Sequence, residues 1–195
     1  YEMVYLIVAN SKLQDKVVDM LERAHVNLEN LQFIIQKTNR SWMRDSGPII
    51  VESANKTPEA INFNFNGWAK YKNYRLDKAI PGIVSQNLAI PLTVATYKGK
   101  PVILEGGAID SNGKGTILTS EECLLHPSVQ VRNPGFARTD YEVVFNEYLG
   151  VSNIIWLGNG ILGDDTHGHI DDLCRFVNPD TIITVVESDK KDKNY

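Results

Sequence analysis

The chain has 195 residues, 43% of them hydrophobic and 23% charged, with a formal net charge of −4 at pH 7. These proportions are typical of a globular domain with a buried core, and they exclude a largely disordered protein. An acidic balance without a cluster of Lys or Arg argues against nucleic acid or an anionic membrane as a partner. The two cysteines, Cys123 and Cys174, are too few for a disulfide framework, so we expect a cytoplasmic protein.

The N-terminal part of the sequence predicts a strand, a helix and a second strand. Residues 4–8 form an apolar run of the kind found in buried strands. Ser11 and Gln14 form a capping box, which predicts the start of an amphipathic helix at this point. Residues 31–35 are apolar again and predict the second strand.

The middle of the chain reads as short strands separated by turns. We expect strands at 49–51 and at 60–65, where apolar and polar residues alternate as they do in a half-buried strand. Two further strands are expected at 102–104 and 116–118. The segment 110–113 has the composition of a turn and joins them.

One more helix and two more strands follow. Thr139 and Glu142 form a second capping box, and the helix that they open is expected to close near Gly150. The apolar runs 154–157 and 182–186 are read as buried strands. Strands and helices therefore alternate without a linker, which predicts an α/β class and one domain over residues 1–195.

Polar residues are densest in the segment 158–172, directly after the strand expected at 154–157. Four carboxylates and two imidazoles lie within nine residues there: Asp164, Asp165, His167, His169, Asp171 and Asp172. Apolar residues flank the segment, so it is not simply a solvated face. Such a concentration of titratable side chains favours a functional site over an exposed turn.

Two other types of site compete for this segment. Gly158, Gly160 and Gly163 match the spacing of a nucleotide-binding loop, but the carboxylates that follow would repel a pyrophosphate. One residue separates His167 from His169, a spacing that resembles that of metal ligands. On an extended backbone, this spacing would point both imidazoles the same way. The sequence offers no third cluster of ligands, which argues against a metal-dependent hydrolase.

A third interpretation is a pocket for an organic cation. Asp45 and Asp171 could hold a guanidinium between them, because that group stays charged and needs acceptors in bidentate geometry. Trp42 could stack on the cation. Asp45 could equally form a local ion pair with Arg44 or cap the turn that follows it, and Asp45 taken alone favours that reading.

Glu105 comes at the end of an expected strand and is followed by two glycines, which permit close backbone approach. A carboxylate at that place could orient an imidazole and raise its pKa, so that the imidazole acts as a general acid. A strand-end glutamate facing solvent is an equally good reading of this residue alone.

Taken together, these segments resemble the family of agmatine deiminases and Porphyromonas-type peptidylarginine deiminases, which modify guanidines. The resemblance runs from about residue 42 to residue 195. It rests on the order and spacing of several motifs: Trp42-Met-Arg-Asp-Ser-Gly-Pro48, Asn64-Phe-Asn-Gly-Trp68, Leu104-Glu-Gly-Gly107, Ser120-Glu-Glu-Cys-Leu-Leu125, Arg132-Asn-Pro134 and Asp164-Asp-Thr-His-Gly-His-Ile-Asp171.

The resemblance implies a five-bladed α/β propeller of the pentein type, of which this chain would supply about three ββαβ modules. It implies that Asp45 and Asp171 bind the guanidinium, that His169 is the general acid and base, and that Glu105 is its partner. By the same resemblance Asp165 would lie near the distal amine of the substrate and Trp42 would form a pocket wall. The resemblance implies neither a metal nor a cofactor.

The reaction implied is the hydrolysis of agmatine to N-carbamoylputrescine and ammonia through a cysteine-bound thiouronium. Arginine or peptidylarginine is the second choice of substrate, and a guanidinium-binding relic without catalysis is the alternative from another class. Nothing in the sequence matches the Gly-rich loop that carries the family's cysteine, and Cys123 and Cys174 read as core residues. We therefore expect a catalytic-domain fragment that is inactive alone and prone to associate, with a homo-oligomer as one form of that association.

Overall fold

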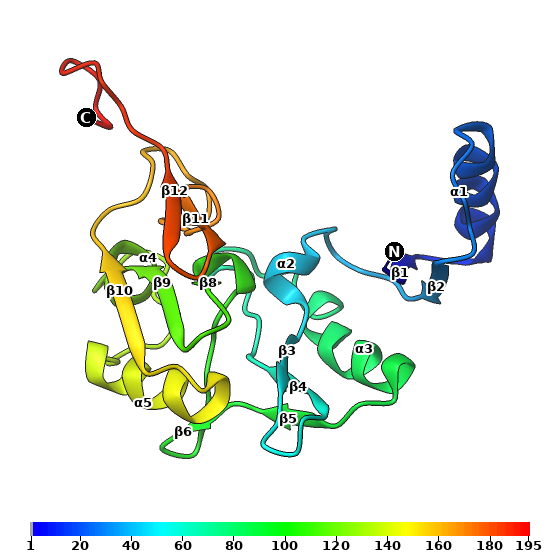
Figure 1. Ribbon diagram of the computed structural model, residues 1–195, viewed down its shortest axis with the longest axis horizontal. Helices are drawn as coiled ribbons and strands as arrows, with labels where there is room; N and C mark the ends of the chain where they lie inside the picture. The colour runs from blue at the N-terminus through cyan, green and yellow to red at the C-terminus, as the bar shows by residue number, and fades with distance from the viewer. Residues whose placement is uncertain (1) are drawn as a thin grey trace.

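The computed structural model describes residues 2–195 as a mixed α/β fold built from five small sheets of two or three strands (Figure 1). The elements in chain order are β1 (Val4–Val8), α1 (Ser11–Arg23), β2 (Leu31–Ile35), α2 (Met43–Ser46), β3 (Ile49–Glu52), β4 (Pro58–Asn62), η1 (Asp77–Ala79), α3 (Ile80–Leu88), β5 (Leu92–Val94), β6 (Thr96–Tyr97), β7 (Lys100–Pro101), η2 (Gly106–Ala108), β8 (Asp110–Ser111), β9 (Thr116–Ser120), α4 (Glu121–Leu125), α5 (Arg138–Leu149), β10 (Asn153–Leu157), β11 (Cys174–Asn178) and β12 (Thr181–Thr184).

One arrangement of strands occurs twice. In the sheet β3-β4-β5 the first two strands are antiparallel, the last two are parallel, and α3 connects the parallel pair. The sheet β8-β9-β10 repeats this pattern, with α5 in the connection. The segment β1-α1-β2 is the same unit without its first strand, because its two strands are parallel and the helix joins them. These units correspond to the ββαβ modules expected from the resemblance.

The helix boundaries correct two predictions from the sequence. α1 is capped by Asn10, whose side-chain oxygen accepts a hydrogen bond from the Leu13 backbone N–H at 2.9 Å, so Ser11 is already helical. α5 begins at Arg138 because the Asp140 carboxylate accepts a bond from the Ala137 backbone N–H at 2.8 Å. Several polar residues near each start could cap the helix, and the three-dimensional geometry selects among them. The predicted end of α5 at Gly150 is confirmed, with φ +65°.

Strands form as predicted at β1, β2, β3, β9 and β10, although β1 and β10 are more exposed than the buried strands expected there, and two other predictions need correction. The strand predicted at 60–65 ends at Asn62, and the one predicted at 102–104 does not form. Asn64 lies beyond the end of β4 and forms an isolated parallel bridge with Ile103. The Asn64 backbone N–H donates a hydrogen bond to the Val102 carbonyl at 2.8 Å. The alternating residues there join two units to each other and do not extend one sheet.

The main core lies within and between the two complete units. Its fully buried side chains include Leu104, Ile117, Tyr141, Val144 and Phe145. By contrast, β1-α1-β2 extends from the body as an arm, and no residue of α1 is buried. The run predicted as a buried strand at 182–186 forms β12 only up to Thr184 and is exposed. Neither α1 nor β12 therefore contributes a buried side chain to the core.

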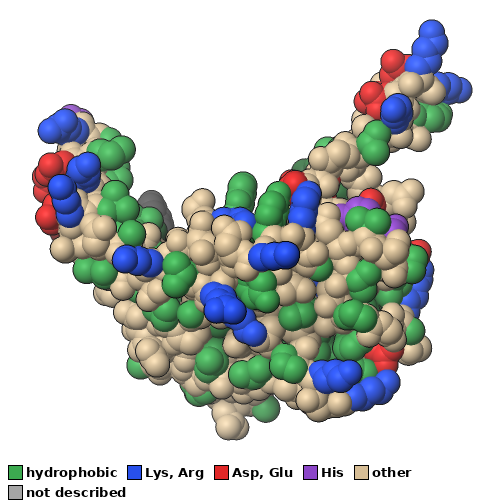
Figure 2. Space-filling view, turned by 180° about the vertical axis from the view of Figure 1, so that it is seen from behind, with side chains coloured by type: hydrophobic (Ala, Val, Ile, Leu, Met, Phe, Trp, Pro, Cys, Tyr) green, Lys and Arg blue, Asp and Glu red, His purple; other side chains and the backbone are tan. Residues whose placement is uncertain are grey.

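The surface is consistent with the expectation from charge. Figure 2 shows the arm and the C-terminal segment rising from the body, with Lys and Arg side chains scattered over the face in view. They do not gather there into one basic patch. Among the described residues, no helix combines the length and the apolar character needed to cross a membrane.

Candidate active site

Three segments that are far apart in sequence bring four titratable side chains together in the interior. Asp45 comes from α2, Glu105 from the residue before η2, and His169 and Asp171 from the loop before β11. The Nδ1 atom of His169 lies 3.7 Å from Asp45 Oδ1 and 3.6 Å from Asp171 Oδ1. Its Nε2 atom lies 3.7 Å from Glu105 Oε2. One imidazole is therefore placed among three carboxylates.

Gly107 allows this convergence. A Cβ atom at that position would lie 2.6 Å from Asp45 Oδ1, 2.6 Å from His169 Nδ1 and 2.8 Å from Asp171 Oδ2, which no side chain could tolerate. The Gly107 backbone also ties the segments together. Its N–H donates to Asp45 Oδ1 at 3.2 Å, and its carbonyl accepts from the backbone N–H groups of Ile170 and Asp171. The second glycine of the Leu104-Glu-Gly-Gly107 motif is thus required for steric reasons.

Charge and burial set the protonation states of the cluster. Burial raises the pKa of Asp45 to about 6, even though His169 opposes that shift. Burial alone would lower the pKa of His169, but the carboxylates of Asp171, Glu105 and Asp45 raise it to about 9. The imidazole is therefore a cation at neutral pH. That leaves it able to donate a proton, as a general acid must.

Glu105 is ionised in spite of complete burial, because a buried arginine faces it. Burial would raise the pKa of Glu105, but Arg132 and His169 together hold it below its usual range. The Nε atom of Arg132 lies 3.3 Å and 3.2 Å from the two carboxylate oxygens. The interpretation of Glu105 as a solvent-facing residue is therefore wrong, since both side chains of the pair are fully inaccessible.

The loop that carries His169 is folded around Asp164. The carboxylate of Asp164 accepts hydrogen bonds from the Thr166, Gly168 and His169 backbone N–H groups at 2.8 to 3.1 Å. The backbone is turned and not extended, with φ +65° at His167. His167 consequently points away from the cluster, where its Nδ1 atom is 3.1 Å from Glu122 Oε1. The premise that His167 and His169 share one metal through an extended backbone is wrong.

Asp165 and Trp42 occupy more exposed positions than the four central residues. Asp165 is held by Lys70, whose Nζ atom is 2.6 Å from Oδ1, and by the Tyr71 hydroxyl at 2.9 Å from Oδ2. Trp42 precedes α2 and is 62% exposed. The tryptophan that contacts a site carboxylate is Trp68, whose Nε1 donates to Asp45 Oδ2 at 3.1 Å. In the sequence, Trp68 is one residue of the motif Asn64-Phe-Asn-Gly-Trp68, and its position there does not predict where its side chain points.

Two further interpretations from the sequence are settled by local structure. Residues 158–173 contain no helix, so the glycines there do not form a phosphate-binding helix start. Asp45 does not pair with Arg44, because the Arg44 guanidinium turns toward Asp110 at 3.9 Å. Cys123 is buried, and burial raises the pKa of its thiol. Cys174 is buried at the start of β11, in agreement with its interpretation as a core residue.

Asp45, His169 and Asp171 place donor atoms within 4.8 Å of one another, a grouping that could in principle hold a metal ion. A metal ligand must be the neutral imidazole, whereas the raised pKa of His169 favours the protonated form. The same two carboxylates suit a planar organic cation, which needs acceptors and no free lone pair on the imidazole.

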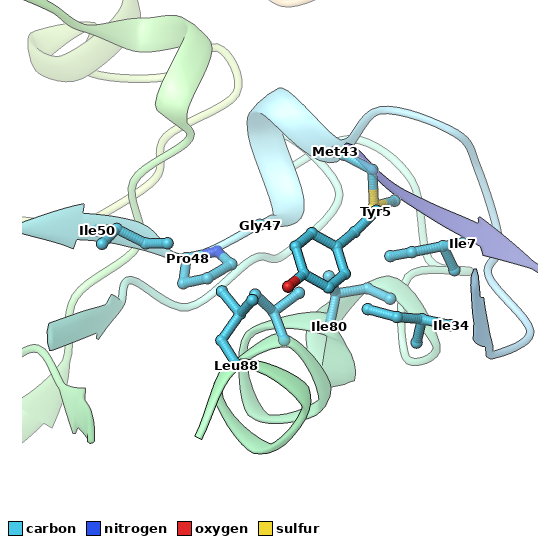
Figure 3. Close-up of a pocket in the computed structure, with 10 residues that line it drawn as sticks. Tyr5, Ile7, Ile34, Met43, Gly47, Pro48, Ile50, Ile80 and Leu88 are labelled. Atoms are coloured by element: carbon cyan, nitrogen blue, oxygen red, sulfur yellow. The ribbon is translucent and has the colours of Figure 1, made fainter. Parts of the chain in front are cut away.

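An apolar pocket of about 210 Å³ lies elsewhere, between the arm and α3 (Figure 3). Tyr5 and Ile7 of β1 face Ile80 and Leu88 of α3 across it, with Pro48 at one side. The lining carries no charged side chain, so this pocket has no group that could recognise a guanidinium or transfer a proton at neutral pH.

Comparisons with known proteins identify the family of the chain. The family model of Porphyromonas-type peptidyl-arginine deiminase matches residues 1–195. An agmatine deiminase of Pseudomonas syringae pv. syringae is 33% identical over 178 residues, which cover 89% of this chain and 46% of that protein. The chain therefore belongs to the Porphyromonas-type peptidyl-arginine deiminase family, as its motifs predict.

Solved structures within the family have the same fold. A substrate-bound cysteine-to-serine variant of the C. jejuni agmatine deiminase matches with a TM-score of 0.83 and 32% identity, covering 100% of this chain and 54% of that one. The agmatine deiminase of Enterococcus faecalis matches with a TM-score of 0.80 and 25% identity, covering 97% and 50%. The chain thus spans about half the length of these relatives.

Proposed function

We propose that this chain forms the guanidinium-binding half of a deiminase that hydrolyses agmatine to N-carbamoylputrescine and ammonia. The observation that carries the proposal is the placement of one protonated imidazole between Asp45 and Asp171, with Glu105 behind it. Relatives at about one-third identity are named agmatine deiminases. Agmatine carries the planar, permanently charged group that two carboxylates recognise.

In the proposed reaction, Asp45 and Asp171 hold the guanidinium and keep its carbon electrophilic. A cysteine thiolate attacks that carbon, and His169 gives its proton to the departing nitrogen, which leaves as ammonia. Water attacks the thiouronium that remains and gives one proton to His169. When the C–S bond breaks and the thiolate is regenerated, the remaining hydroxyl proton is lost to solvent, where it converts the released ammonia to ammonium, and the neutral ureido product leaves. Glu105 stabilises the imidazolium throughout because it stays ionised.

We propose that the cysteine comes from outside these 195 residues. Cys123 is fully buried behind the cluster, and its raised pKa keeps it a thiol, which is a poor nucleophile. Cys174 is buried at the start of β11, in the small cluster formed with Leu118 and Ile170. The coverage of about half of each relative is consistent with this division. On the same grounds we propose that the repeated units belong to a five-bladed propeller.

Activity of the full-length protein on agmatine tests the proposal, with ureido product as the readout. Asp45→Asn keeps the shape of the side chain but removes its charge, and His169→Asn removes the acid that donates the proton. We expect each to lower kcat/KM on the order of 100-fold. Asp140→Asn is the matched control, because this carboxylate of α5 pairs with Lys98 outside the cluster. Unchanged activity in both site variants would refute the assignment.

Substrate choice is tested in the same assay. Arginine and a peptide with C-terminal arginine are the alternatives, and both carry a carboxylate where agmatine carries only an ammonium. A higher kcat/KM for either would move the proposal to that substrate within the same reaction class. Absence of ureido product from all three would leave a binding protein without catalysis, which equilibrium binding of agmatine would then reveal.

A further inference from the structure

Arg132 forms contacts to both sides of the candidate site, although it touches neither Asp45 nor Asp171. Its Nε atom is bonded to both oxygens of Glu105, at 3.3 and 3.2 Å. One terminal nitrogen donates to the Thr166 carbonyl at 2.5 Å, and the other donates to the Gln130 carbonyl at 2.9 Å. Thr166 lies three residues before His169, within the loop that Asp164 organises.

We propose that Arg132 is a positioning residue. Its guanidinium fixes Glu105 relative to the Thr166–His169 loop, so that the His169 imidazole faces a carboxylate that is both charged and fixed in place. The inference rests on the function proposed above and adds a residue and a role to it. It follows from the geometry of a planar fork that has one donor facing Glu105 and two facing backbone carbonyls.

Burial makes this arrangement consequential. The side chains of Arg132 and Glu105 are both fully inaccessible. A buried charge without its partner is far less stable than the pair, so each of the two depends on the other. Without Arg132, Glu105 would be an uncompensated buried anion next to His169. It would then either take up a proton or move, and in both cases the imidazole would lose its charged partner.

Backbone contacts give Arg132 a role that a lysine could fill only in part. A lysine ammonium could compensate the charge of Glu105, but it is a compact group and could not reach Glu105, Thr166 and Gln130 together. The charge and the loop contact can therefore be separated by substitution. Arg132→Lys keeps the charge and loses the fork, whereas Arg132→Met loses both.

A double-variant cycle in the full-length protein tests the inference. Arg132→Met and Glu105→Gln are made singly and together, and kcat, KM and the melting temperature are measured. If Arg132 acts through Glu105, the double variant loses at least tenfold less kcat than the product of the two single losses, because the second change finds the pair already broken. Losses that multiply would overturn the inference.

Stability provides a readout that does not require activity. Arg132→Met should have a lower melting temperature than the double variant, since only the single change leaves Glu105 buried and unpaired. Arg132→Lys should have a melting temperature and a kcat that lie between those of Arg132→Met and those of the wild type. The matched control is the exposed pair of Arg138 and Glu121, whose corresponding cycle should show no coupling in kcat.

The outcomes separate this inference from the proposed function. Product from agmatine with an uncoupled cycle would refute the role of Arg132 and leave the deiminase standing. No product in the wild-type protein, together with a coupled melting temperature, would refute the function and leave only a structural pair. That second result would also overturn the positioning role, which requires a catalytic His169.

Discussion

At the scale of single residues, the unusual feature is a cationic imidazole that is almost completely buried. His169 is 2% exposed, yet its pKa is raised to about 9 because Asp171, Glu105 and Asp45 surround it. A histidine buried among apolar side chains would be neutral, so the carboxylates outweigh the loss of water. This balance links the charge of the site to the stability of the fold.

The first prediction concerns the dependence of stability on pH. The folded-state pKa of His169 lies above its ordinary value of 6.5, so its stabilising contribution is complete below pH 6.5 and is lost as pH rises through 9. The full contribution is on the order of 3 kcal/mol. Urea unfolding of the wild type and His169→Gln at pH 6 and pH 9.5 measures it. A free-energy difference between the two proteins that stays constant with pH would contradict the assignment.

The second prediction concerns substrate choice and Lys70. The ammonium of Lys70 already occupies Asp165, and both groups are partly open to solvent. If Asp165 binds the distal ammonium of agmatine, Lys70 competes with the substrate. An exposed ion pair is worth at most about 1 kcal/mol. Lys70→Met should therefore lower the KM for agmatine by about 2- to 5-fold and raise the KM for arginine.

The control for that prediction is Lys98→Met. Lys98 forms a similar exposed pair with Asp140, at 2.9 Å. It lies outside the cluster, so its loss should leave the ratio of the two KM values unchanged. An equal effect of Lys70→Met on agmatine and arginine would remove Asp165 from the recognition of the distal group.

At the scale of elements, the short turn η2 decides whether the site can form. Its central residue, Gly107, is packed against three polar side chains of the cluster. The third prediction is that Gly107→Ala abolishes agmatine binding, because the added methyl group would lie 2.6 Å from both Asp45 Oδ1 and His169 Nδ1. Calorimetric titration with agmatine measures this loss.

Gly82→Ala provides the control at the same scale. Gly82 lies within α3, and a Cβ atom there would meet nothing within 4 Å. Alanine stabilises a helix interior relative to glycine by roughly 0.5–1 kcal/mol, so this variant should be slightly more stable and bind agmatine normally. Wild-type binding by Gly107→Ala would show that the cluster does not hold the substrate.

At the scale of the whole molecule, the arm β1-α1-β2 and the C-terminal segment expose apolar side chains. Met20 on α1 is 69% exposed and Val186 is 83% exposed. Large apolar side chains exposed in this way favour association with other protein surfaces. The fourth prediction is therefore that the 195-residue chain associates with itself in a concentration-dependent way, as sedimentation would detect.

Matched helix substitutions test whether the arm is responsible. Met20→Glu should reduce the association, because it places a charge on the apolar face of α1. Val143→Glu adds the same charge to an exposed apolar position of α5 on the body, and should have less effect. A monodisperse monomer at all concentrations would contradict the prediction.

The sequence predicted the family from the order and spacing of its motifs, and the resemblance to that family singled out Asp45, Glu105, His169 and Asp171. Taken alone, Asp45 and Glu105 each allowed a simpler structural interpretation. The sequence also predicted the strands whose apolar runs are continuous, such as β1 and β9, since that periodicity depends only on neighbouring residues. The predicted N-caps were displaced by one residue at α1, where Asn10 and not Ser11 caps the helix, and by two residues at α5, where Ala137 and not Thr139 holds the cap position, because local sequence does not decide which residue caps a helix.

Tertiary structure alone decided which groups face one another. The pairing of Glu105 with Arg132 spans 27 residues, and the contact of Trp68 with Asp45 spans 23. Neither direction follows from local pattern, because the orientation of a side chain in a loop depends on the packing of distant segments. The same holds for His167, which the sequence placed beside His169 and which the turned backbone directs toward Glu122. The sequence thus determined which chemical groups are present, and the packing of three separate loops determined which of them form the site.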